Sequence, residues 1–71
     1  MKKSRLAALL RQVRLDADLT QSQLADAIGQ TQSYVSKYEA GEQRLDLMEL
    51  ETVCNAVGIK LIVFVGRYLE T

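Results

Sequence analysis

The stretch from residue 20 to residue 41, TQSQLADAIGQTQSYVSKYEAG, constrains this chain more than any other. Thr20 is a suitable N-cap, because its hydroxyl can accept a hydrogen bond from a free amide of the following helical turn. Gly29 allows the positive φ angle that ends a first helix, and Thr31 can cap a second one. These signals place two short helices at residues 21–28 and 32–39. Two such helices joined by a glycine-bearing turn predict a helix-turn-helix unit.

The second helix of this unit has one apolar side and one polar side. At about 100° per residue, Val35 and Tyr38 share a face that can pack inward. Short or amide-bearing side chains and one cation point away from that face: Gln32, Ser33, Ser36 and Lys37. Glutamine can bond an adenine edge, lysine suits the acceptors of guanine, and serine can donate or accept. These four are the candidate base-reading residues; the alternative is an ordinary solvated face, which the neighbouring capped helix makes the weaker interpretation.

Composition limits the classes of function that the chain can have. The 71 residues predict one domain, and nine cationic side chains balance nine anionic ones, so net charge gives no support to nucleic-acid binding. The chain has only one cysteine, which excludes a disulfide framework, and it has no histidine, so a conventional zinc site is excluded as well. We therefore expect the protein to bind no metal and no cofactor and to have no enzymatic activity. Without a signal peptide or a membrane-spanning apolar run, the protein is expected to be cytoplasmic and associated with the nucleoid.

A first helix is expected at residues 4–17, because its apolar residues follow helical spacing and form one stripe. Arg14 lies at the edge of that stripe. Before this helix, Lys2 and Lys3 could reach a DNA phosphate as a short arm, or could belong to an ordinary solvated terminus.

A fourth helix is expected at residues 47–57, after a polar loop. Arg44 is the only cation of that loop and is either a phosphate contact or simply exposed. Asp46 and Glu49 have the spacing of a capping box. Cys54 falls on the apolar face, and we interpret it as a small core residue, because no histidine is present to activate it.

The segment at residues 59–65 is almost continuously apolar, β-branched and aromatic, and it predicts a strand. No second strand is evident, so the simplest partner is the same strand of another copy, paired antiparallel across a two-fold axis. The alternative is a fifth helix packed on the core. The strand hypothesis assigns dimerisation to Ile59, Leu61, Ile62, Val63, Phe64 and Val65.

The chain resembles the Cro and phage-repressor type of helix-turn-helix domain, the XRE family, over about residues 6–58. The resemblance is carried by Leu19-Thr20-Gln21-x-x-Leu24-Ala25, Ile28-Gly29, Val35-Ser36-x-Tyr38-Glu39-x-Gly41 and Cys54-x-Ala56-Val57-Gly58. It implies that Gln21, Gln43 and Arg44 contact DNA phosphates and that the outward residues of the second motif helix read bases. It also implies a structural ion pair between Arg14 and Glu39. Thr31 and Tyr34 complete the candidate phosphate contacts, although Tyr34 could equally lie on the protein surface.

The predicted fold is all-α: a four-helix, lambda-repressor-like domain over residues 1–71, in which a C-terminal strand replaces the usual fifth helix. The resemblance implies a sequence-specific, double-stranded DNA-binding transcriptional regulator. We expect a homodimeric repressor that reads an inverted-repeat operator. The alternative is the antitoxin of a toxin–antitoxin pair, which would bind a partner toxin and regulate its own operon.

Overall fold

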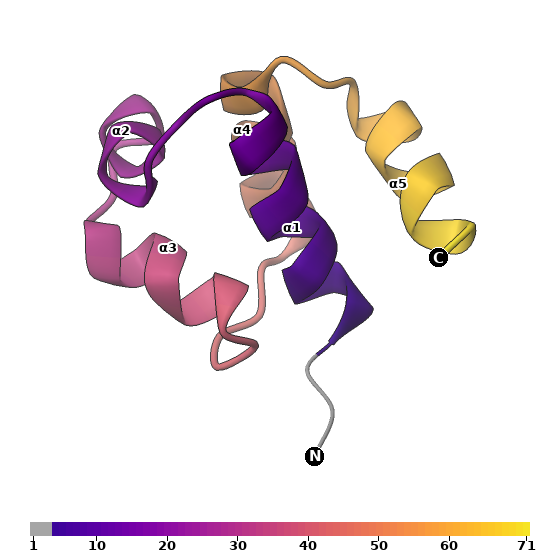
Figure 1. The fold of residues 1–71 in the computed structure, drawn as a ribbon, viewed down its shortest axis with the longest axis horizontal. Helices are drawn as coiled ribbons and strands as arrows, with labels where there is room; N and C mark the ends of the chain where they lie inside the picture. The colour runs from indigo at the N-terminus through magenta and orange to yellow at the C-terminus, as the bar shows by residue number, and fades with distance from the viewer. Residues whose placement is uncertain (1–3) are drawn as a thin grey trace.

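The computed structural model describes residues 4–71, which fold into five α-helices with no β-strand in that range (Figure 1). Helices α2 and α3 pack against each other, α1 packs against α3, and α4 contacts both α2 and α5. In Figure 1, α2 and α3 lie on the left and α5 on the right, with α1 between them. The five helices are α1 Arg5–Asp16, α2 Gln21–Ala27, α3 Gln32–Glu39, α4 Leu47–Val57 and α5 Leu61–Leu69.

Side-chain caps determine where the first four helices begin. The Thr20 hydroxyl accepts a bond from the amide of Gln23 at 3.0 Å, and the Gln23 side chain accepts one from the amide of Thr20 at 2.9 Å. Asp46 and Glu49 form the same reciprocal capping box at the start of α4. The remaining caps are the hydroxyls of Ser4 and Thr31. Each cap satisfies amides that have no partner within the helix.

Apolar side chains from all five helices meet in one core. Tyr38, Leu24 and Val53 are almost completely buried, and the core also includes Leu10, Val35, Cys54 and Phe64. Burial raises the pKa of the Cys54 thiol, because an apolar environment disfavours the charged thiolate. Cys54 therefore packs as a small core residue.

The strand predicted at residues 59–65 is wrong: residues 59 and 60 connect α4 to α5, and residues 61–65 belong to α5. Gly58 ends α4 in the left-handed region at φ 78°, and α5 begins at Leu61. Leu61, Phe64 and Tyr68 follow helical spacing and pack on the core, with Phe64 only 1 % exposed. A helix satisfies its own backbone groups, whereas a single strand would need another chain to do so.

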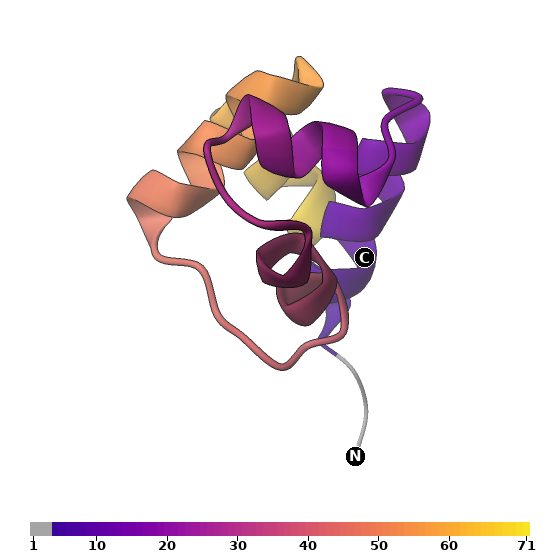
Figure 2. The same ribbon diagram turned by 90° about the vertical axis from the view of Figure 1, so that its left-hand side faces the viewer.

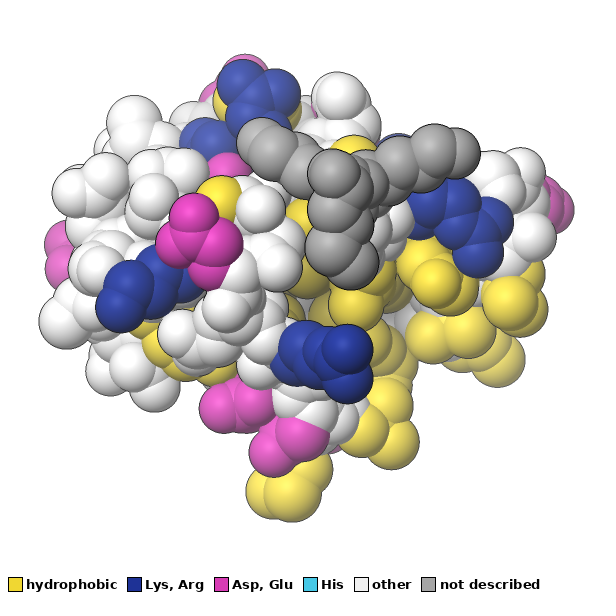
Figure 3. Space-filling model, turned by 90° about the horizontal axis from the view of Figure 1, so that it is seen from below, with side chains coloured by type: hydrophobic (Ala, Val, Ile, Leu, Met, Phe, Trp, Pro, Cys, Tyr) yellow, Lys and Arg dark blue, Asp and Glu magenta, His cyan; other side chains and the backbone are white. Residues whose placement is uncertain are grey.

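The dimer assignment that depended on this strand needs the same correction. Phe64 belongs to the core, and Ile59 and Leu61 are half-buried against it. Three of the six assigned residues, Ile62, Val63 and Val65, are exposed on the outer side of α5 together with Leu69. Figure 3 shows hydrophobic side chains gathered on the right, where α5 lies, while the α2 and α3 side is mostly polar. Antiparallel strand pairing is therefore excluded as the means of dimerisation for this segment.

Two further properties of the described residues bear on function. No helix within residues 4–71 is long and apolar enough to cross a membrane. The same residues contain no group of three histidine, cysteine or acidic side chains that could hold a metal ion.

Candidate nucleic-acid interface

Helix α3 presents a polar face to solvent because its apolar face is locked into the core. Val35 is 0 % exposed and Tyr38 is 1 % exposed, so the opposite side of the helix must face outward. The residues on that side are all exposed: Gln32, Ser33, Ser36 and Lys37. In Figure 2, α2 lies across the view and α3 is seen almost end-on, both on the viewer's side. The structure therefore gathers the four candidate base-reading residues on one accessible surface.

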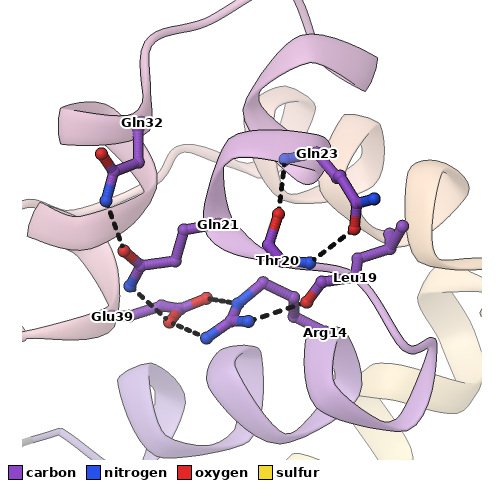
Figure 4. Close-up of polar contacts among 7 residues, drawn as sticks. All are labelled: Arg14, Leu19, Thr20, Gln21, Gln23, Gln32 and Glu39. Carbon is purple, nitrogen blue, oxygen red and sulfur yellow. Dashed lines mark hydrogen bonds and ion pairs between the residues drawn. The ribbon is translucent and has the colours of Figure 1, made fainter.

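A buried ion pair fixes α3 to α1. Arg14 Nε lies 2.7 Å from Glu39 Oε2, and Arg14 Nη2 donates to Glu39 Oε1 at 3.0 Å (Figure 4). Arg14 Nη1 also donates to the backbone oxygen of Leu19 at 2.8 Å, which ties the turn before α2 to the same guanidinium. Both charged residues are only 6 % exposed. The hydrogen bond to Glu39 raises the pKa of Arg14, against the opposing effect of burial.

Two glutamines extend this ion pair to the tip of α3. Gln21 Nε2 donates to Glu39 Oε1 at 3.1 Å, and Gln32 Nε2 donates to Gln21 Oε1 at 3.1 Å (Figure 4). Sequence reasoning treated the two glutamines as separate contacts and missed this chain of hydrogen bonds. Each glutamine is the first residue of its helix, but Gln21 lies at the end of α2 away from the turn, so the contact depends on how α2 crosses α3 and has no local signal in the sequence.

Arg11 is a second residue that sequence reasoning missed. It lies on the exposed side of α1 and lines a shallow hollow of about 220 Å³ together with Gln21, Ser36, Glu39 and Ala40. A cation therefore stands beside Gln21 and Ser36, on the same surface as the polar face of α3. The signal was its position one helical turn before Arg14.

The predicted phosphate contacts are not equally placed. Gln43 and Arg44 are exposed in the loop between α3 and α4, which runs past α3 in Figure 2. Thr31 is exposed, and its hydroxyl already accepts a bond from the amide of Tyr34 at 3.2 Å. Lys2 and Lys3 lie outside the described residues.

Tyr34 faces α4 more than it faces the polar surface of α3. Its ring stands edge-on to Tyr38, with centroids 5.7 Å apart, and it lines a small pocket of about 140 Å³ with Glu49, Ile28, Gln30 and Thr52. Burial and the nearby Glu49 carboxylate raise the pKa of Tyr34. A neighbouring carboxylate disfavours an approaching phosphate, so this placement weakens the case for Tyr34 as a phosphate contact.

The capped pair α2 and α3, with a buried ion pair behind it and an exposed polar face in front, defines the helix-turn-helix class. The helix-turn-helix family model matches residues 10–64, and the chain belongs to that family. The resemblance stated from the sequence is thereby confirmed. The chain has no significant match among curated proteins.

Solved structures of regulators have the same fold. The clp gene regulator ClgR from Corynebacterium glutamicum is 29 % identical, with a TM-score of 0.85 over 93 % of this chain and 85 % of that one. The wild-type restriction-modification controller protein C.Esp1396I is 22 % identical, with a TM-score of 0.87 over 94 % of this chain and 88 % of that one. A tetramer of C.Esp1396I in complex with its natural 35 base-pair operator matches with a TM-score of 0.86, 22 % identity and the same coverage. Membership of the helix-turn-helix family supports a DNA-binding transcriptional regulator, and the solved structures support the fold.

Proposed function

We propose that this protein is a sequence-specific, double-stranded DNA-binding regulator of transcription that inserts α3 into the major groove. The observation that carries the proposal is the exposed polar face of α3 over a fully buried apolar face. A helix held in this way can enter a groove without exposing core residues. Its base-reading set is Gln32, Ser33, Ser36 and Lys37, of which Gln32 stands at the N-terminal tip.

Phosphate contacts around α3 would set the register of the protein on the duplex. Gln43 and Arg44 lie in the loop that follows α3, whereas Gln21 and Arg11 lie at the hollow on its other side. Contacts on both flanks hold a recognition helix in one orientation, while the bases are read between them. The zero net charge of the chain is compatible with this arrangement, because local cations can supply the attraction.

The active species in this proposal is a homodimer joined through α5. Ile62 is 79 % exposed and Leu69 is 72 % exposed, with Val63 at 49 % and Val65 at 38 % on the same short helix. A second copy offers the same apolar surface, so a two-fold axis through this face covers both surfaces at once. The two α3 helices would then read half-sites about one helical turn apart, and the operator would be an inverted repeat. Occupation of a promoter by such a dimer would repress transcription.

Selection from a random duplex pool at near-physiological salt tests the proposal directly. Enrichment of an inverted repeat with half-site centres about ten base pairs apart is the expected result. A pool with no enriched sequence, or binding that disappears as salt rises, would mean backbone affinity alone and would refute the proposal. The antitoxin alternative has no comparable support, since neither the family nor the solved relatives point to a toxin partner.

A further inference from the structure

The hydrogen bonds that run from Glu39 to Gln32 have only one possible direction. A carboxylate in an ion pair with arginine only accepts hydrogen bonds, so the nitrogen of the Gln21 amide must face Glu39. The oxygen of the same amide then faces Gln32, and it too can only accept. Gln32 must therefore turn its nitrogen toward Gln21. The direction follows from the chemistry of Glu39 and does not depend on how either amide is drawn.

We propose that Glu39 is a positioning residue for base specificity: through Gln21 it orients the Gln32 amide so that α3 prefers adenine. This inference rests on the proposed function, in which Gln32 reads a base edge. With one N–H used on Gln21, Gln32 retains a second N–H on that side and a free carbonyl oxygen on the other. The major-groove edge of adenine has an acceptor at N7 beside a donor at N6, which matches this pair. Guanine has two acceptors, N7 and O6, so the Gln32 oxygen would face another oxygen.

Burial of Glu39 makes the orientation a property of the fold rather than of the surface. The residue is 6 % exposed, and two bonds from Arg14, at 2.7 and 3.0 Å, prevent its carboxylate from turning away. Two links of 3.1 Å each then separate this fixed carboxylate from Gln32 at the surface. A free glutamine at a helix tip can exchange the positions of its amide oxygen and nitrogen by rotation, whereas the Gln32 amide is restrained with its nitrogen toward Gln21.

Glu39→Gln is the decisive variant, because it preserves size and shape but replaces an obligatory acceptor by an amide that can also donate. Gln21 can then turn over, present its nitrogen to Gln32 and reverse the chain of hydrogen bonds. Gln32 would in turn present its nitrogen where its carbonyl oxygen stood, and the match to adenine would be lost. The variant therefore changes a preference between bases, which a purely structural role of Glu39 would leave intact.

The experiment starts from the duplex selected from the random pool. Gln32→Ala first identifies the base pair that Gln32 reads, as the one position whose preference disappears. Wild type and Glu39→Gln are then titrated, by fluorescence anisotropy, against four duplexes that differ only there. We expect wild type to prefer the adenine duplex by about tenfold and Glu39→Gln to retain about twofold or less.

Two controls separate orientation from stability and from charge. Val53→Ala destabilises the core at a residue 1 % exposed on α4, a helix that contributes no residue to the hydrogen-bond chain, and should keep the adenine preference in its folded fraction. Glu51→Gln makes the same chemical change on the exposed side of α4 and should behave as wild type. If Glu39→Gln does not fold, Gln21→Ala removes the middle of the chain at a half-buried surface position and should lose the same preference.

Equal weakening of all four duplexes by Glu39→Gln or by Gln21→Ala, with the adenine preference retained, would overturn the inference. A non-adenine preference at the Gln32 position in wild type would overturn it as well. If no sequence is enriched from the pool, the proposed function itself fails and the inference fails with it. Enrichment followed by a retained preference in the variants refutes only the role of Glu39.

Discussion

Replacing Arg14 by methionine should destabilise the fold more than any surface substitution, because it leaves the Glu39 carboxylate buried without its cation. Methionine has a similar length and fills much of the same volume, so the change removes charge and hydrogen bonds rather than packing. Three bonds disappear: two to Glu39, at 2.7 and 3.0 Å, and one to the backbone oxygen of Leu19, at 2.8 Å. Only the 3.1 Å bond from Gln21 remains on the carboxylate.

The expected loss is about 3–5 kcal/mol in the free energy of unfolding, the range for breaking a buried pair by removing one partner. The side chains of Arg14 and Glu39 are 7 % and 3 % exposed, so solvent screens the pair very little. A chain of 71 residues has about 4–10 kcal/mol of stability in total. Arg14→Met should therefore consume a large share of it. Arg14→Met combined with Glu39→Met should recover most of the loss, since no charge is then left buried.

Urea denaturation followed by far-ultraviolet circular dichroism measures these differences, with both single variants and the double variant completing a thermodynamic cycle. A coupling energy of about 2 kcal/mol or more, with the double variant more stable than Arg14→Met, is expected. A loss under about 1 kcal/mol in Arg14→Met would refute the reasoning, because the carboxylate would then be solvated or bound to another partner. A double variant as unstable as Arg14→Met would refute it equally, since packing rather than charge would account for the loss.

Four further substitutions test other parts of the molecule. Phe64→Ala removes a ring that is 1 % exposed and should lower the free energy of unfolding by about 3–5 kcal/mol in a denaturant titration; a change under about 1 kcal/mol would mean that α5 is not docked on the core. Ile62→Asp, at a side chain 79 % exposed, should convert a dimer to a monomer in sedimentation while the helical circular-dichroism signal is retained; persistence of the dimer would place the interface elsewhere. Lys37→Ala should relax base preference at one position of the selected operator, and a uniform loss across all sequences would instead make it a phosphate contact. Arg44→Ala should weaken all sequences alike and reduce the salt slope by about one, so an altered base preference with an unchanged slope would contradict its assignment.

The first four helices could be predicted because their signals are local. Thr20, Thr31 and Asp46 each cap a helix through the amide three residues ahead, and no distant contact is needed to make them do so. The polar face of α3 follows in the same way, since one inward-facing residue, Val35, fixes the angular position of all the others.

Residues 59–65 resisted prediction because a continuous apolar run satisfies the period of a strand and that of a helix equally. β-Branched composition favoured the strand, and the preference was overridden by tertiary packing. Phe64 fills the core between α1 and α4 only if Leu61 and Tyr68 lie on the same side of a helix. That requirement depends on where α1 and α4 lie, which no window of the sequence contains.

In the candidate interface, too, local features could be predicted from the sequence, whereas contacts between helices could not. The outward direction of Gln32 can be derived from its own helix. The hydrogen bond between Gln32 and Gln21, however, depends on how α2 crosses α3. The hydrogen bond between Gln21 and Glu39 depends on α1, because Arg14 of that helix holds Glu39 in place. Arg11 was missed for the same reason, since only the packing of α1 against α3 brings it to the hollow beside Ser36.

The two members of the ion pair therefore have unequal consequences for function. Arg14 and Glu39 contribute jointly to stability, because each is the main partner of the other in a buried site. Only Glu39 also bonds to Gln21, so only Glu39 lies directly on the path that leads to the base-reading surface. Replacing Arg14 removes the cation that neutralises the Glu39 carboxylate, and the expected cost is a loss of stability. Position 39 requires a group that accepts at both oxygens, because Arg14 donates to both of them. In the proposal, the same acceptor directs the Gln21 amide and thereby the base preference of Gln32.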